Sequence, residues 1–161
     1  MLKDWNKVEQ PTAEEVDKRL ANAKNSLLQQ QIAMKEKKLP VIVLLEGWGA
    51  AGKGSVLGKL IKNIDPRFFK VAVMDEPTEE EKRKPFLYRH FVKIPEAGKF
   101  VFMDSGWMSE VTSQKLSGEL SEEEYKKRIE SIKRFERQLT DNGYLLLKFF
   151  FNIDKKEQKK R

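Results

Sequence analysis

A glycine-rich segment, EGWGAAGKGS, has the residue types and spacing of a phosphate-binding loop. In the motif G-x-x-x-x-G-K-[ST], glycines let consecutive backbone N–H groups turn toward phosphate oxygens, and the lysine reaches the phosphates being transferred. Gly47 and Gly52 are the two fixed glycines and Lys53 is the lysine, whereas Gly54 takes the usual Ser/Thr position and Ser55 comes one residue late. We therefore expect phosphates to bind along the whole loop, which comprises Gly47, Trp48, Gly49, Ala50, Ala51, Gly52, Lys53, Gly54 and Ser55.

A carboxylate, Asp104, directly follows the apolar segment KFVFM. Enzymes that transfer phosphoryl groups place an acidic residue near the phosphate loop, where it helps to hold Mg²⁺. We interpret Asp104 as the ligand of a Mg²⁺ ion. The alternative, a solvated carboxylate at the end of a strand, remains open.

The segments around these residues predict a strand before the loop and a helix after it. The apolar run LPVIVLLE, opened by Pro40, is typical of a strand buried on both faces of a parallel sheet. A helix is expected from about 53 to 64, and the strand before Asp104 is expected at 99–103. This order of strand, loop and helix is the context that a phosphate-binding motif requires.

Strand and helix patterns alternate over the rest of the chain. The alternation predicts an α/β fold with a mostly parallel sheet, formed by one domain over residues 1–161. Within it, an amino-terminal helix packs against an α/β core of residues 40–161. The remaining expected elements are strands at 68–75 and 144–153, helices at 12–37 and 121–142, a helix interrupted at Pro85 within 76–92, and a helix start after 153.

Composition narrows the possible classes of protein. The 161 residues contain no cysteine, which excludes disulfides and thiolate chemistry, and no apolar stretch is long enough to cross a membrane. The first ten residues lack the apolar region of a secretory signal, so we expect a cytoplasmic protein. The net charge is +7, which indicates either a polyanionic partner or a solvated lysine-rich surface.

Beyond the loop, the sequence resembles the polyphosphate kinase 2 family, whose loop reads approximately G-x-D-A-A-G-K-G. The resemblance continues through NIDPRFFKV, through PTEEEKRKPFLYRHFVKIPEAGKFVFMDSGWM and through FERQLTDNGYLLLKFFFNIDKKEQKKR. These segments are similar to the family's Pro-Thr start, Leu-aromatic-Arg segment, P-x-x-G turn, Asp-x-x-Trp strand end, Phe-Glu helix and Gln-Lys/Arg helix start. Together they cover about residues 27–161, a combination that generic nucleotide kinases lack.

The resemblance implies a P-loop kinase-like three-layer sandwich that transfers phosphoryl groups between inorganic polyphosphate and a nucleoside mono- or diphosphate, with Mg²⁺ as cofactor. Lys53 would cradle phosphates and Asp104 would hold the metal. Arg89 matches the arginine of the Leu-aromatic-Arg segment and is the leading candidate to guide polyphosphate. Other basic candidates for that role are Arg67, Lys82 and Arg83.

The chain departs from the family pattern in three ways. Gly49 replaces the loop aspartate, which lies where metal and acceptor phosphate meet. The family's strand end D-R-S-W-Y is replaced by DSGWM, so Ser105 occupies the position of an arginine and Met108 that of a tyrosine. The pattern also ends at Arg161, before the family's basic helical lid and last strand, which predicts a truncated fold with an exposed apolar edge. These features resemble the degenerate first copy of two-domain members.

Three functional hypotheses therefore remain open. The chain is a Mg²⁺-dependent phosphotransferase, or it is a catalytically impaired module that binds phosphate or polyphosphate. In the second case it supports an active partner domain or works in a homo-oligomer. A nucleic-acid-binding protein, suggested by charge alone, is the least favoured class.

A few other residues also yield predictions. Trp48 either stacks on a base or covers the edge of the sheet, and His90 is expected to pack rather than to catalyse. Glu46 and Glu136 are expected to be buried partners of Arg or Lys, and residues 149–151 to form a core strand.

Overall fold

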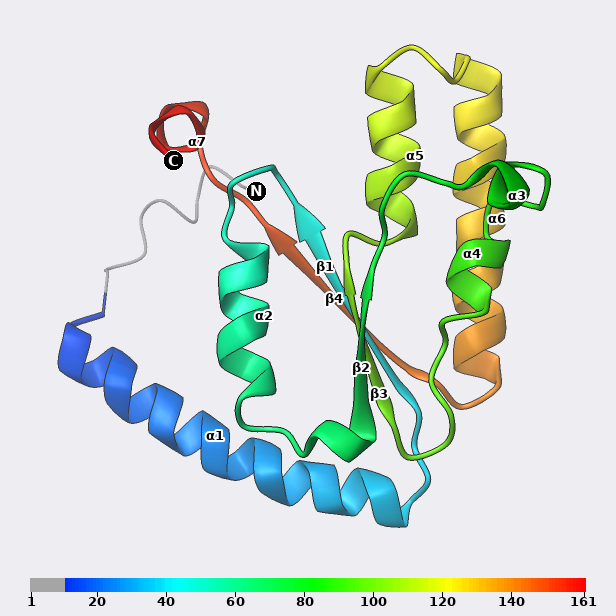
Figure 1. Cartoon of the computed structure of the whole chain (residues 1–161). Coiled ribbons are helices and arrows are strands. Elements are labelled where there is room, and N and C mark those ends of the chain that lie inside the picture. Colours follow the sequence, from blue (N-terminus) through cyan, green and yellow to red (C-terminus); the bar gives the residue numbers. More distant parts are fainter. Residues whose placement is uncertain (1–10) are drawn as a thin grey trace.

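The computed structural model describes residues 11–161, so the part of the predicted domain that covers residues 1–10 lies outside the described residues. The described chain forms a four-stranded parallel sheet in the order β2-β3-β1-β4 (Figure 1). This confirms the α/β class and the parallel sheet. The strands are β1 (Val41–Gly47), β2 (Phe69–Val73), β3 (Phe100–Asp104) and β4 (Leu145–Phe151).

Strand β1 lies at the centre of the fold, because it is paired with β3 on one side and β4 on the other. Its first six residues are buried, as the apolar run predicts for a strand covered on both faces. The register places Leu45 opposite Asp104, and Gly47 opposite Phe151. The end of β1, where the glycine loop begins, is therefore beside the end of β3.

Helices cover both faces of the sheet and make three layers, as expected. On one side, α2 (Lys53–Ile61) and the carboxyl-terminal half of α1 (Ala13–Glu36) pack on Val41, Val43 and Leu45. On the other side, α5 (Trp107–Leu116) and α6 (Glu122–Asp141) pack on Ile42 and Leu44. Figure 1 shows α2 and the α5–α6 pair on opposite sides of the strands. No helix in the described range 11–161 is both long and apolar enough to cross a membrane.

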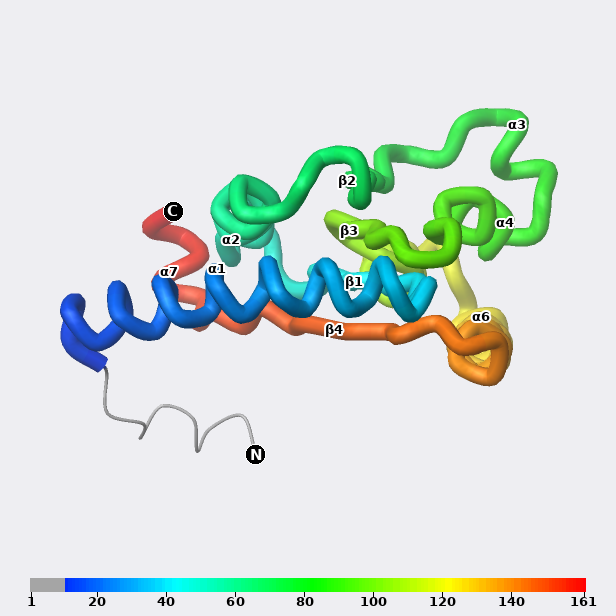
Figure 2. The backbone as a smooth tube through the Cα atoms, turned by 90° about the horizontal axis from the view of Figure 1, so that it is seen from below, coloured from blue at the N-terminus to red at the C-terminus, as the bar shows by residue number. Residues whose placement is uncertain are grey.

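The long helices begin where the sequence predicts. Thr12 caps α1 and Ser121 caps α6, each in a capping box with the glutamate three residues later. The expected packing of the amino-terminal helix against the core holds only for the second half of α1, where Leu27 and Met34 contact the core. Its first turns, with Val16 and Leu20 exposed, project beyond the sheet in both views (Figures 1 and 2).

Short helices replace the interrupted helix expected at 76–92. They are α3 (Glu79–Lys82), which starts with a third capping box at Thr78, and α4 (Tyr88–Phe91), with Pro85 between them. A 3₁₀ turn (Pro66–Phe68) precedes β2, and α7 (Lys155–Lys160) follows β4. Helix α5 is not predictable from the sequence pattern, because only Trp107 and Val111 of its ten residues are buried and the apolar stripe is short.

Strand β4 differs from its prediction as a core strand. It forms one edge of the sheet, and Phe149 and Phe150 are 51% and 59% exposed. The reason is that, among the described strands, β4 pairs with β1 alone, so its other edge has no neighbouring strand. The expectation of an exposed apolar edge is therefore confirmed for the described residues.

Candidate functional site

The loop between β1 and α2 has the backbone conformation that its glycines permit. Gly47 and Gly52 have φ of 134° and 93°, and Ala50 has φ of 61°. A Cβ atom on Gly47 would lie 2.3 Å from the carbonyl oxygen of Phe151, so the contact between β1 and β4 requires glycine there. The loop thus turns sharply away from the sheet and delivers the chain to the first turn of α2.

The amino-terminal end of α2 is suited to bind an anion. No acidic residue lies in its first turn, and its cap residue Gly52 has no side chain to satisfy the first N–H groups. Unpaired N–H groups and the helix dipole together favour a bound phosphate. Lys53 adds a positive charge, and its Nζ lies 3.2 Å from the carbonyl oxygens of Gly47 and Trp48.

An open pocket of about 520 Å³ lies over the loop and the carboxyl ends of β2 and β3. Asp104 and Ser105 line it from β3, and Val73 and Met74 line it from β2 and the residues after it. Arg161 lines it from the end of α7. The loop residues in its wall are Ala50, Ala51, Gly52, Lys53, Gly54 and Ser55.

The polar groups of this pocket match the preferences of Mg²⁺. Within residues 11–161 there is no cluster of three or more His, Asp or Glu side chains that would hold a metal alone. Asp104 supplies one carboxylate, and Ser55 and Ser105 supply hydroxyl groups in the same pocket. Mg²⁺ binds hard oxygen ligands and is held in proteins by one or two carboxylates together with substrate phosphates. The donor set therefore fits the ion.

The other basic residues predicted for the site do not line this pocket. Arg67 lies in the turn before β2, at the opposite end of the strand, and pairs with Asp65 at 2.6 Å. The hydrogen bonds from Arg67 lower the pKa of Asp65 to about 2. Lys82 pairs with Glu79 on α3, and Arg83 is the exposed residue that follows that helix. Arg89 lies on α4, where it is buried between the carboxylates of Glu81 and Glu110.

Two residues of the carboxyl-terminal segment contact the loop, and the sequence analysis did not single them out. Gln158 donates to the carbonyl oxygen of Gly49 at 3.1 Å, and Arg161 donates to that of Ala50 at 3.4 Å. The available signal was the resemblance to a Gln-Lys/Arg helix start, which does not specify what that helix contacts. Gln158 and Arg161 contact the loop because the tertiary structure brings the end of the described chain next to it.

Trp48 covers the edge of the sheet. Its indole N–H donates to Asn152 Oδ1 at 2.9 Å, and its ring meets the ring of Phe150 edge-on at 6.0 Å. Of the two alternatives for this residue, the structure favours the sheet edge over base stacking. Trp48 thereby connects the loop to the segment between β4 and α7.

The buried polar residues show mixed outcomes. His90 is fully buried against Trp107, so its predicted packing role is confirmed. Glu136 accepts from Lys148 at 2.8 Å and from the Trp107 indole at 2.9 Å, so its predicted lysine partner is confirmed, although its side chain is only partly buried. Glu46 is buried as predicted, but its predicted basic partner is wrong, because its carboxylate accepts from the Ser109 hydroxyl.

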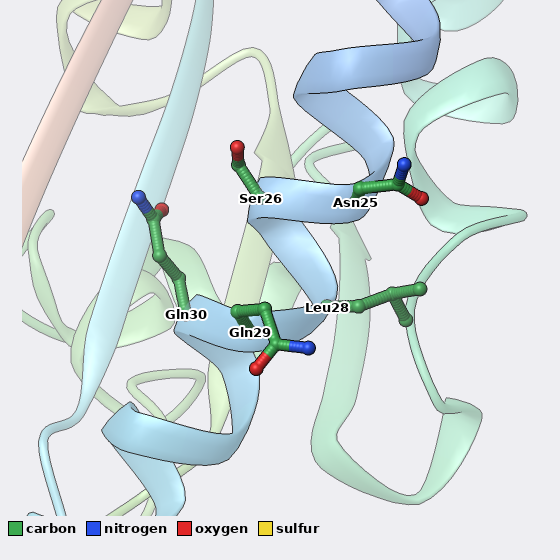
Figure 3. Close-up of a pocket in the computed structure, with 5 residues that line it drawn as sticks. All are labelled: Asn25, Ser26, Leu28, Gln29 and Gln30. Atoms are coloured by element: carbon green, nitrogen blue, oxygen red, sulfur yellow. The ribbon is translucent and has the colours of Figure 1, made fainter.

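A further depression on the surface of α1 has no comparable chemistry. Figure 3 shows its five labelled side chains, Asn25, Ser26, Leu28, Gln29 and Gln30, leaving two successive turns of the helix in different directions. They carry no ionisable group, and every lining residue belongs to one helix. We therefore assign the functional site to the loop pocket.

The parallel sheet, the glycine loop and the acidic strand end together give the chain the architecture of the P-loop kinase-like α/β fold. The sequence profile described as Polyphosphate kinase 2 matches residues 10–161. The chain therefore belongs to the polyphosphate kinase 2 family.

Individual relatives agree with this assignment. The chain is 31% identical over 144 residues to ADP-polyphosphate phosphotransferase 3 of Rhizobium meliloti (strain 1021), which covers 89% of this chain and 51% of that protein. It is 34% identical over 125 residues to Polyphosphate:AMP phosphotransferase of Pseudomonas syringae pv. tomato, and this match covers 78% of this chain and 25% of that protein.

A crystal structure of a Pseudomonas aeruginosa PA01 protein described as polyphosphate kinase 2 superposes on all of this chain. The TM-score is 0.92 at 30% identity, and the match covers 35% of that protein. The chain thus spans about half the length of the Rhizobium relative and about a third or less of the other two.

Proposed function

We propose that this chain binds phosphates in the loop pocket and transfers a phosphoryl group between inorganic polyphosphate and a nucleoside mono- or diphosphate. The observation that carries the proposal is the shared pocket of the loop, Lys53 and Asp104. Family membership supports the reaction class, and the names of the relatives supply ADP and AMP as candidate nucleotides. The cysteine-free sequence supports a cytoplasmic location.

Each group has a distinct task in this proposal. The N–H groups at the start of α2 and the Lys53 ammonium bind the oxygens of the phosphates, because both carry positive charge at the pocket wall. Asp104, with the hydroxyls of Ser55 and Ser105, is the candidate ligand set for Mg²⁺. When bound, Mg²⁺ supplies charge neutralisation between neighbouring phosphates.

The transfer itself needs little covalent chemistry from the protein. A P–O bond forms to the acceptor phosphate oxygen while the P–O bond to the donor chain breaks, so the phosphoryl group is transferred from the donor to the acceptor. The residues of this chain orient the two anions and offset their repulsion. Gly49 offers no carboxylate at the loop, so orientation of the acceptor rests on fewer groups than in the family pattern.

A second candidate function is a phosphate-binding module with impaired catalysis. Gly49 and Ser105 are the observations that favour it, because both positions lack the charged side chain of the family pattern. Such a module would support an active partner domain or work in a homo-oligomer. Nucleic acid remains the least favoured partner, since only the net charge suggests it.

The two functions are separated by a coupled assay and a binding measurement on the same protein. Polyphosphate, Mg²⁺ and AMP or ADP are supplied, turnover is followed, and pyrophosphate binding is measured by calorimetry. The phosphotransferase requires turnover that Lys53→Ala lowers by about 100-fold, while Lys59→Ala on the exposed face of α2 leaves it unchanged. Binding without turnover establishes the module, and absence of both refutes the phosphate site.

A further inference from the structure

The guanidinium of Arg89 lies in a buried acidic environment away from the phosphate loop. The side chain is 6% exposed, Nη1 lies 3.5 Å from Glu110 Oε2, and Nε lies 3.8 Å from Glu81 Oε2. Nη2 donates to the backbone carbonyl oxygen of Asp75. A buried arginine is stable only with such partners, because removal of its charge from water is costly.

Glu110 also holds the residue next to Arg89. The same carboxylate oxygen lies 3.0 Å from Nε2 of His90, which is fully buried. The His90 ring meets the ring of Trp107 edge-on at 5.7 Å. One glutamate of α5 therefore anchors two successive residues of α4.

This pair joins the two strand ends that form the pocket wall. Asp75, whose carbonyl Arg89 binds, directly follows Met74 in that wall. Glu110 belongs to α5, whose first residue, Trp107, follows the pocket residues Asp104 and Ser105 after one glycine. Sheet pairing holds Val73 opposite Asp104, so a shift of Arg89 relative to Glu110 would move the residues just beyond that pair, Met74 and Asp75, relative to the β3 side of the pocket.

The same turn of α5 is tied to the strand that carries the loop. Ser109 donates to the carboxylate of Glu46, one residue before Gly47. The space there is tight, since a Cβ atom on Gly106 would lie 2.7 Å from Glu46 Oε1. Ser109 thus connects α5 to the end of β1, and Glu110 connects it through Arg89 to Asp75, two residues after β2.

We propose that Arg89 and Glu110 form a positioning pair that sets the width of the phosphate pocket, and that Arg89 does not itself contact phosphate. The expected effect on phosphate binding rests on the proposed function. The pairing of Arg89 with Glu110, called the brace below, is a property of the fold itself. Arg89 has its charge offset by two carboxylates and has donated to a backbone carbonyl, so no net charge is left to attract an anion.

A double-mutant cycle separates a brace from a ligand. We would measure pyrophosphate binding with Mg²⁺ by calorimetry, and the melting temperature, for Arg89→Lys, Glu110→Gln and the double variant. If the pair is a brace, Arg89→Lys and Glu110→Gln should each weaken pyrophosphate binding by about tenfold. The double variant should bind pyrophosphate no more weakly than the single variant with the lower affinity. Arg137→Lys and Glu123→Gln, both exposed on α6, are the matched controls.

A direct contact between Arg89 and phosphate would give a different result. If Arg89 were a phosphate ligand, Arg89→Lys would weaken pyrophosphate binding, whereas Glu110→Gln would leave it unchanged or tighter, because it frees the guanidinium. That outcome overturns the proposal.

A second variant and a binding-independent measurement guard against misfolding and against failure of the proposed function. Glu110→Asp keeps the charge but shortens the side chain, so we expect it to fold and to weaken pyrophosphate binding about threefold or more. Hydrogen exchange of the amides of residues 73–76 should be faster in all three single variants, whether or not the protein binds phosphate. Unchanged exchange in that segment overturns the brace, whereas absent pyrophosphate binding by the unmodified chain refutes only the proposed function.

Discussion

The side-chain amide nitrogen of Gln158 lies 3.1 Å from the carbonyl oxygen of Gly49, although 109 positions separate the two residues. A Cβ atom on Gly49 would lie 3.8 Å from the same nitrogen, which is an ordinary contact distance. The position where the family pattern carries a loop aspartate thus has room for a side chain and faces a hydrogen-bond donor. Helix α7 and the loop lie side by side at the carboxyl ends of the strands (Figure 1).

Gly49→Asp should raise Mg²⁺-dependent phosphotransfer. The new carboxylate has space beside Gln158 and adds a negative charge to the loop, next to Ala50, which lines the pocket together with Asp104. We expect an increase of at least about tenfold in turnover in the coupled assay, because one charged group placed at the reacting phosphates has effects of this size or larger. Gly49→Asn, which has the same shape without the charge, is the control; equal activity of the two variants would show that charge is not what the loop lacks.

Gln158→Ala should weaken phosphate binding by loosening the loop. The Gly49 carbonyl would lose its donor, and the peptide that presents the Ala50 N–H on its opposite side would be free to rotate. Loss of one hydrogen bond predicts weaker pyrophosphate binding by about threefold to tenfold in calorimetry. Gln138→Ala, on the exposed surface of α6, should leave the affinity unchanged; a similar loss there would argue against a specific role for Gln158.

Gly47→Ala should destabilise the fold. The added methyl group would lie 2.3 Å from the Phe151 carbonyl oxygen, and alanine disfavours φ of 134°. We expect the free energy of unfolding to fall by about 2 kcal/mol or more in urea titrations. Gly58→Ala, at a helix position with nothing within 4 Å, should instead add about 0.5–1 kcal/mol; an equal loss at both glycines would refute the steric argument.

Acid titration should show Asp65 as an unusually strong acid. Hydrogen bonds from Arg67 lower its pKa from 3.8 to about 2 in the folded chain. Because the folded pKa is depressed, the contribution of this pair to stability is complete above about pH 4 and is lost as the pH falls toward 2. In NMR titrations the Asp65 carboxyl signal should shift near pH 2 in the unmodified chain and closer to 3.8 in Arg67→Ala; identical titration midpoints would contradict the pairing.

Local features were predictable because they depend on neighbours in the chain. The apolar run 41–45, the glycine loop and the starts of the helices at Thr12 and Ser121 each depend on residues within a few positions, and their backbone geometry follows from those residues. The placement of Asp104 beside the loop followed from one general rule, that parallel strands end at the same edge of a sheet.

Long-range features were not predictable in the same way. Arg89 reads as a candidate for phosphate binding by resemblance, but burial beside Glu110 and the Asp75 carbonyl directs its charge inward. Arg67 lies away from the pocket because it precedes β2, which runs parallel to β3 and β1, and the pocket is at the carboxyl ends of the strands. The apolar residues of β4 are exposed because β4 is an edge strand, which composition alone does not reveal.

The sequence by itself determined the loop, the order of the four strands, the likeness to one family and the missing carboxylate at Gly49. Only the tertiary structure decided which charges face the pocket, that Gln158 and Arg161 contact the loop, and that Glu46 meets Ser109. The physical reason is range. Backbone conformation is set by sterics and hydrogen bonds between near neighbours, whereas burial and electrostatic pairing depend on elements that meet only when the sheet and its two helical layers have packed.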